Sequence, residues 1–104
     1  MDKYEKAAAA IAGIEQEMKD IGFWQPDPLL PEAYNFRQAF AADTMAFSQW
    51  LQFIFIPRVK EIIENRTQFP SGSQVGIVAV KEFEGNDRAE KLVRLLNEFD
   101  ALFG

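Results

Sequence analysis

Apolar positions recur every three or four residues over the first twenty residues of the chain, which predicts an amphipathic helix. The recurring positions are Tyr4, Ala8, Ile11, Ile14, Met18 and Ile21. Asp2 with Glu5 has the form of a capping box at the start, and Gly22 supplies a left-handed residue that can end the helix. We therefore expect a first helix from Asp2 to Ile21.

Residues 23–42 break this pattern. Pro26, Pro28 and Pro31 lack N–H groups and restrict the backbone, so they oppose both a regular helix and a central strand, although Pro31 to Tyr34 could form one short turn. Apolar side chains are nevertheless too frequent here for a mobile linker: Phe23, Trp24, Leu29, Leu30, Tyr34, Phe36 and Phe40. We expect a long ordered loop that folds back over the helices.

A second helix is predicted to begin at Asp43, a good N-cap residue. Most of its surface is apolar, and only Ser48, Gln49 and Gln52 form a narrow polar stripe, so we expect it in the middle of the fold. Pro57 cannot donate to the carbonyl four residues earlier. The helix must therefore kink at Pro57, or a new helix must begin with Pro57 in its first turn.

The C-terminal third begins with a turn at residues 69–73. Residues 75–80 are rich in β-branched side chains, but the chain offers no second strand to pair with them. We expect an extended entry into a short helix that ends near Glu84. Asp87 with Glu90 resembles another capping box, and a stripe of Leu and Phe predicts a final helix to the end of the chain.

These elements predict an all-α protein, a compact bundle of about four helices with a long proline-containing loop between the first and the second. A chain of 104 residues suits one domain, so we expect residues 1–104 to form a single helical-bundle domain. Its content of 48% hydrophobic and 13% aromatic residues is sufficient for a packed core.

The composition of the chain excludes several kinds of catalytic site, metal site and partner. The chain contains no His and no Cys, which excludes Ser-His-Asp and Cys-His catalytic arrangements, disulfides, and His- or Cys-ligated metal sites. We predict no cofactor, no metal site and no catalytic residue.

The net charge bears on the partners of the protein. Sixteen acidic against eleven basic residues give a net charge of −5, which argues against nucleic acid as a partner. The absence of a long apolar run and of a signal-peptide pattern predicts no membrane association and a cytoplasmic location.

Two groups of charged residues are candidate sites. The acidic residues lie on the polar faces of predicted helices or in turns, so we interpret them as solvated. Arg88, Lys91 and Arg94 are spaced by three residues and could form a basic stripe for RNA or an acidic partner. Asp87, Glu90 and Glu98 lie four residues from one of them, however, and this spacing predicts ordinary intrahelical ion pairs.

The segment around residues 40–58 has the most informative pattern. Its aromatic residues, together with Trp24, could line a pocket or a docking surface, or could simply pack as a core. Polar residues at the edge of such a cluster complete local hydrogen bonds or contact a partner. The candidate interaction surface or pocket therefore comprises Trp24, Phe40, Asp43, Trp50, Gln52 and Arg58.

The same segment carries a family resemblance. Phe40-x-x-Asp43-Thr44-Met45, Gln49-Trp50-Leu51-Gln52 and Ile56-Pro57-Arg58, together with Gly22-Phe23-Trp24, Phe69-Pro70 and Asp100-Ala101-Leu102-Phe103, resemble the YqcC-like family of small bacterial proteins. The resemblance covers nearly the whole chain and implies a compact four-helix bundle. Ala39 departs from the family pattern, in which proline precedes Phe40, and this bears on the local loop shape. The family is sometimes associated with a tRNA pseudouridine synthase, but this chain is far too short for that enzyme's mixed α/β catalytic domain.

Three functional hypotheses follow. The first is a non-enzymatic accessory module in which an aromatic surface around Trp24, Phe40, Trp50 and Arg58 docks another bacterial protein. The second is a small-molecule-binding protein or enzyme with a pocket between the helices and Asp43 or Arg58 as its polar anchor. The third is an accessory to tRNA modification that uses the basic stripe of the last helix.

Overall fold

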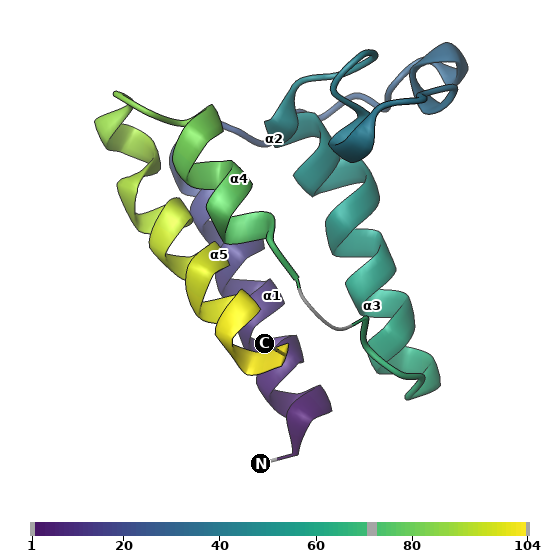
Figure 1. Ribbon diagram of the computed structural model, residues 1–104, viewed down its shortest axis with the longest axis vertical. Helices are drawn as coiled ribbons and strands as arrows, with labels where there is room; N and C mark the ends of the chain where they lie inside the picture. Colours follow the sequence, from purple (N-terminus) through teal and green to yellow (C-terminus); the bar gives the residue numbers. More distant parts are fainter. Residues whose placement is uncertain (1, 71–72, 104) are drawn as a thin grey trace.

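Helix α1, the first element of the computed structural model, spans Lys3–Asp20 (Figure 1). A carboxylate oxygen of Asp2 accepts the backbone N–H of Glu5 at 2.9 Å, and Gly22 has a φ of +79°, so the predicted start and stop signals are confirmed. The side chains buried from α1 are Ala7, Ile11, Ile14, Glu17 and Met18. The structure describes residues 2–70 and 73–103.

The connection from α1 to the second helix is ordered and contains two short 3₁₀ turns, η1 (Pro31–Tyr34) and η2 (Ala39–Ala41). Most of its aromatic side chains pack against the core, as the loop interpretation predicts. The prediction is wrong for two apolar side chains, since Leu30 is 74% exposed and Tyr34 is 46% exposed. Both lie in or next to η1, which places them on the outer side of the loop.

The second helix starts later than predicted. Helix α2 spans Phe47–Trp50, and the cap residue is Ala46, whose N–H is bound by the side-chain oxygen of Gln49 at 2.8 Å. Asp43 is therefore not its N-cap. Instead, the carboxylate of Asp43 accepts backbone N–H groups from inside the preceding loop, and the chain turns once more before the helix begins.

Pro57 is accommodated by a widened helical turn. A π-helical segment, η3 (Leu51–Phe55), joins α2 to α3 (Ile56–Asn65), and the N–H of Ile56 bonds to the carbonyl of Leu51 five residues earlier. Pro57 thus lies in the first turn of α3, as in the second of the two predicted alternatives, but α3 continues from η3 without a break. The widened turn shifts the hydrogen-bond register before the proline, so residues 47–65 form one continuous helix.

The end of α3 is tied to the start of α1. Arg66 ends α3 with a left-handed φ of +50°, and its guanidinium pairs with the Asp2 carboxylate at 2.6 Å. The Tyr4 hydroxyl lies 2.9 Å from the carbonyl of Arg66 and 2.8 Å from that of Thr67, so it shares its one proton between them. These contacts fix the chain that leaves α3.

Residues 75–82 are helical throughout, so the predicted extended entry is wrong. Helix α4 spans Val75–Glu82, and its β-branched residues are held in a helix by packing on the last helix rather than by local preference. The final helix α5 (Glu90–Phe103) follows a 3₁₀ turn, η4 (Asp87–Ala89). The cap is Asn86, whose side chain accepts the N–H of Arg88 at 3.1 Å, and not Asp87 as predicted.

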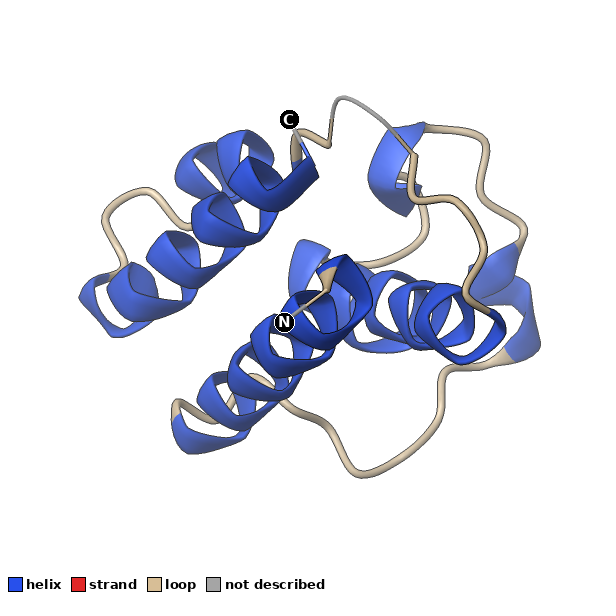
Figure 2. Ribbon diagram, turned by 90° about the horizontal axis from the view of Figure 1, so that it is seen from below, coloured by secondary structure: helices blue, strands red, loops and turns tan. Residues whose placement is uncertain are grey.

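The helices form a compact all-α bundle (Figures 1 and 2). Within the described ranges there are four helices and no strands, when α2, η3 and α3 are taken as one. Helix α1 packs against α5 on one side and α3 on the other, and α4 packs on α5. The middle position therefore belongs to α1 and not, as predicted, to the second helix, whose apolar surface is covered partly by the proline loop, through Phe40, and partly by α5, through Phe99. None of the helices in the described residues combines the length and the hydrophobicity needed to cross a membrane.

Candidate functional site

An aromatic cluster joins the second helix to the loop and to α5. The ring of Trp50 stacks on Phe47 and Phe55, with centroids 5.7 and 5.5 Å apart. Phe40 meets the Trp50 ring edge-on at 4.8 Å, and Phe99 meets Phe55 edge-on at 5.2 Å. Trp50 is only 8% exposed, so of the two interpretations given for these aromatics, a packed core describes Trp50.

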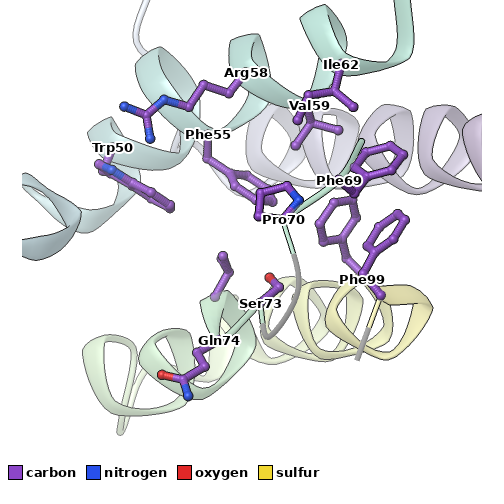
Figure 3. A pocket seen from close by; sticks show the side chains of 12 residues that line it. Trp50, Phe55, Arg58, Val59, Ile62, Phe69, Pro70, Ser73, Gln74 and Phe99 are labelled. Carbon is purple, nitrogen blue, oxygen red and sulfur yellow. The ribbon is translucent and has the colours of Figure 1, made fainter. Parts of the chain in front are cut away.

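A pocket of about 260 Å³ opens at the edge of this cluster, between α3, the connection after it, and the α4–α5 pair (Figure 3). Figure 3 places Trp50 and Arg58 at one end and Phe69 with Phe99 at the other. Most of its wall is apolar and includes Phe55, Val59, Ile62, Val75, Phe99 and Phe103. The pocket is therefore suited to an apolar group.

Arg58 carries the only charge among the described residues that line this pocket. Its side chain is exposed on α3, and in the described part of the chain it forms no salt bridge and no side-chain hydrogen bond. The guanidinium is thus available to an anion that enters the pocket from the Trp50 end.

The opposite wall is positioned by Asp100. Its carboxylate accepts the hydroxyl proton of Ser73 and, at 2.6 Å, the backbone N–H of Gly76 in the first turn of α4. Gly76 is buried against Asn97, where an added Cβ would lie 2.5 Å from the amide oxygen of Asn97. This close approach of α4 to α5 sets the place of Val75 in the pocket wall.

Gln52, a predicted site residue, holds the proline loop. It is 7% exposed, and its side-chain amide bonds to both backbone groups of Gln25, accepting the N–H at 3.0 Å and donating to the carbonyl at 2.8 Å. Gln49 donates to the side chain of Gln25 at 3.0 Å. The polar stripe of the second helix therefore satisfies the backbone of the loop that covers it.

Asp43, another predicted site residue, also acts within the loop. Its two carboxylate oxygens accept the backbone N–H groups of Arg37, at 3.0 Å, and Gln38, at 3.3 Å. These bonds, led by the one from Arg37, lower the pKa of the Asp43 carboxyl. An exposed carboxylate that is already held in its charged form stabilises the turn and has no acid–base function near neutral pH.

Trp24 lies apart from the pocket beside Arg58. It is half-buried, lines a separate shallow hollow with Gln25 and Gln49, and has the ammonium of Lys19 5.1 Å from its ring centroid. Phe40 lines another hollow, beside Phe47. Of the six predicted site residues, the structure thus brings only Trp50 and Arg58 together in one pocket.

The charged groups on α5 differ from the prediction. The intrahelical pairs expected for Lys91 and Arg94 do not form within 4.0 Å in the described residues, and Lys91 instead lies 3.8 Å from the carboxylate of Glu17 on α1. Arg88, Lys91 and Arg94 are exposed, as a solvated face would be.

Glu15 on α1 is the acidic side chain with the most ion pairs in the described part of the chain. Glu15 pairs with Lys60 and Lys19, both at 2.9 Å, and these hydrogen bonds, that of Lys60 first, lower its pKa. Across residues 2–70 and 73–103, no three acidic side chains gather as metal ligands would. Glu15 is thus engaged in surface ion pairs with side chains of α1 and α3.

One exposed apolar face was missed by the sequence interpretation. Ile77 is 65% exposed and Val80 is 54% exposed, and their spacing of three places them on the same face of α4. Gly76 and Ala79 pack the other face against α5. The helical spacing was the signal that could have found this face, but the β-branched residues led to the prediction of an extended segment.

The chain is similar to known proteins over most of its length. The model of the DUF446 family, described as tRNA pseudouridine synthase C, matches residues 6–102. An uncharacterized protein of Haemophilus influenzae is 33% identical over 73 residues, which cover 67% of this chain and 69% of that protein. The uncharacterized protein YqcC of Escherichia coli is 27% identical over 109 residues, which cover 99% of this chain and 95% of YqcC.

A longer relative also matches. The tRNA pseudouridine synthase C of Pectobacterium carotovorum subsp. carotovorum is 26% identical over 88 residues, which cover 85% of this chain but only 23% of that protein. The chain therefore spans less than a quarter of this relative's length.

The fold has a solved counterpart. The solution NMR structure of YqcC from Escherichia coli superimposes with a TM-score of 0.87 at 24% identity, and the match covers 99% of this chain and 89% of that one. The likeness confirms the fold.

Proposed function

The chain belongs to the YqcC-like DUF446 family, and from this premise we propose that it is a non-enzymatic accessory module that docks onto another bacterial protein. The observation that carries the proposal is the Pectobacterium relative, in which the similar region makes up only 23% of a protein named tRNA pseudouridine synthase C. Joining two modules in one chain raises their effective concentration, which is useful for modules that act together. We therefore assign a tRNA pseudouridine synthase as the partner.

The chemistry of the chain supports an accessory function. It has no His and no Cys, and the three carboxyl groups with clearly shifted pKa values, Asp2, Glu15 and Asp43, are all shifted downward by hydrogen-bond donors. General acid–base catalysis at neutral pH requires a pKa near 7. The absence of cysteine suits the reducing conditions of the cytoplasm, where we place the complex.

The surface that we assign to docking is the α4 face formed by Ile77 and Val80. Large side chains exposed on one face of a short helix bury apolar area when a partner covers them, and such patches are typical of protein interfaces. The aromatic residues predicted for this purpose are less suitable, because Trp50 is buried and could reach a partner only if the core opened.

Titration of the chain with a tRNA pseudouridine synthase from the same bacterium tests the proposal. Size-exclusion chromatography with light scattering should give a stable complex that survives ribonuclease. The double variant Ile77→Glu, Val80→Glu should weaken binding by at least about ten-fold, since two charges would be buried against the partner. Leu30→Glu is the matched control, because it changes another strongly exposed apolar side chain on a different part of the surface.

The outcomes separate the hypotheses. A ribonuclease-resistant complex that is lost in the double variant and kept in Leu30→Glu supports docking through α4. Loss on Arg58→Glu instead would move the docking surface to the second helix. A complex that ribonuclease removes would favour an RNA-bridged accessory, and no complex with or without tRNA would contradict the assignment of the partner.

A further inference from the structure

From the pocket beside Arg58 we infer a second binding activity, independent of docking through α4: the pocket binds a small apolar carboxylate, with its hydrocarbon part between α3 and α5 and its carboxylate paired with the guanidinium of Arg58. The inference rests on the shape of the pocket, the nature of its wall and the position of its one charge. Neither the family match nor the similar proteins assign this site.

The size of the pocket sets the size of the ligand. Its volume of about 260 Å³ equals the share of roughly nine water molecules in the liquid, at about 30 Å³ each. A molecule of about ten non-hydrogen atoms fits this volume, which is at the small end of ligand sites.

The wall sets the chemistry of the ligand body. Val59 and Val75 face the pocket from α3 and α4, and Phe55 and Phe99 are buried behind it. The polar residues Ser73 and Gln74 also line it, but the hydroxyl proton of Ser73 is already donated to Asp100. The wall thus offers dispersion contacts and few hydrogen bonds, so the body of the ligand is apolar.

The charge of Arg58 determines which head group the ligand carries. Arg58 is the single charged side chain among the described lining residues, and no described carboxylate neutralises it. In a chain of net charge −5, a cationic group at the mouth of an apolar pocket selects anions locally. A planar guanidinium matches a carboxylate with two parallel hydrogen bonds, and Figure 3 places Arg58 beside Trp50, at the end of the pocket rather than within its apolar part.

A matched set of ligands tests both parts of the inference. Octanoate, octan-1-ol and octylamine share one hydrocarbon chain and differ in head group. Trp24→Phe leaves Trp50 as the only tryptophan, so its fluorescence reports on the pocket. Octanoate should bind with a dissociation constant of about 0.1–1 mM and at least about ten-fold more tightly than the alcohol or the amine.

Variants at Arg58 distinguish the contribution of the charge to ligand binding from that of the apolar cavity. Arg58→Gln should remove the preference for octanoate over octan-1-ol, and Arg58→Lys should restore part of it. Arg88→Gln is the matched control, since it removes an exposed arginine from η4, away from the pocket. Amide shifts in a ¹H–¹⁵N spectrum should concentrate on the wall residues Val59, Val75 and Phe99, and circular dichroism would show that each variant is folded.

An apolar carboxylate can be the C-terminus of a peptide or a free acid, and the two are compared directly. An acetylated dipeptide ending in a leucine carboxylate is titrated beside octanoate, and the tighter binder identifies the source. Saturable binding of either one that requires the charge of residue 58 supports the inference. The absence of saturation up to about 10 mM, equal binding of all three head groups, or shifts located outside the pocket would each overturn it.

Discussion

The carboxylate of Asp100 on α5 accepts the backbone N–H of Gly76 on α4 at 2.6 Å, so one helix caps the start of another. The first N–H groups of any helix lack partners within it, and a carboxylate at this position satisfies one of them and interacts favourably with the helix dipole. Asp100 also accepts the Ser73 hydroxyl, which fixes the chain just before α4.

Replacing Asp100 by Ala should therefore lower the free energy of unfolding by about 1–3 kcal/mol. The loss arises because a buried N–H of α4 is left without its acceptor. Urea denaturation followed by circular dichroism measures it. Asp87→Ala is the control, because the Asp87 side chain forms no hydrogen bond or salt bridge in the described structure. Equal stability of the two variants would show that the cap from α5 contributes nothing.

Gly76→Ala and Gly13→Ala should change stability in opposite directions. An added Cβ at Gly76 would lie 2.7 Å from the Cα of Asn97, so α4 and α5 would have to separate at a cost of about 1–3 kcal/mol. At Gly13, in the exposed middle of α1, nothing lies within 4 Å and alanine favours the helix by about 0.5–1 kcal/mol. Thermal unfolding of both variants checks the signs, and a neutral Gly76→Ala would mean that the two helices are not in close contact.

The Gln52→Leu variant should loosen the proline loop without unfolding the bundle. It leaves the N–H and carbonyl of Gln25 without partners in a partly buried position, which costs about 1–3 kcal/mol. Hydrogen exchange of the Gln25 amide should accelerate, while amides of α5 remain protected. Gln38→Leu provides a glutamine control, since that side chain is exposed in the same loop. Unchanged exchange at Gln25 in Gln52→Leu would refute this account of the loop.

Asp43 should make stability depend on pH in the acidic range. The N–H of Arg37, with that of Gln38, lowers the pKa of Asp43 in the folded state below its ordinary value of 3.8. A lowered folded pKa gives stability that is present above 3.8 and is lost as the pH falls through the folded value. The difference in free energy of unfolding between the native chain and Asp43→Asn should thus be largest at neutral pH and shrink toward about pH 2.

Urea denaturation at several pH values, with a ¹³C titration of the Asp43 carboxyl, measures this dependence. A difference that grows as the pH falls would mean that the pKa of Asp43 is raised in the folded state and would contradict the hydrogen bonds to the loop.

Elements with local signals could be predicted from the sequence, and elements fixed by distant residues could not. Helix α1 carries its cap, its apolar period and its terminal glycine within its own residues, so its bounds were found. The N-terminus of α4 depends on Asp100, which accepts the N–H of Gly76 from 24 positions further along the chain. The residue types at positions 75–80 do not indicate that contact. Asp43 was assigned to the wrong element because an aspartate can bond backward into a loop as well as forward into a helix.

The candidate site was predictable to a similar extent. Trp50 stood out as a member of the aromatic cluster in residues 40–58 and Arg58 as a polar residue at its edge, and they do meet in one pocket. Phe69, Phe99 and Phe103 were hidden among ordinary core positions, since a side chain that lines a pocket and one that fills a core have the same sequence signature.

The bond between Tyr4 and the end of α3 has a kinetic consequence for this pocket. The Tyr4 ring lies 5.4 Å from that of Phe69, which stacks on Phe103 at 4.2 Å, so the far wall combines contributions from both ends of the chain. Contacts between residues so distant in sequence form slowly, because the chain must first close long loops. In refolding, the pocket should therefore be completed after the individual helices, and fraying at either terminus should open it first.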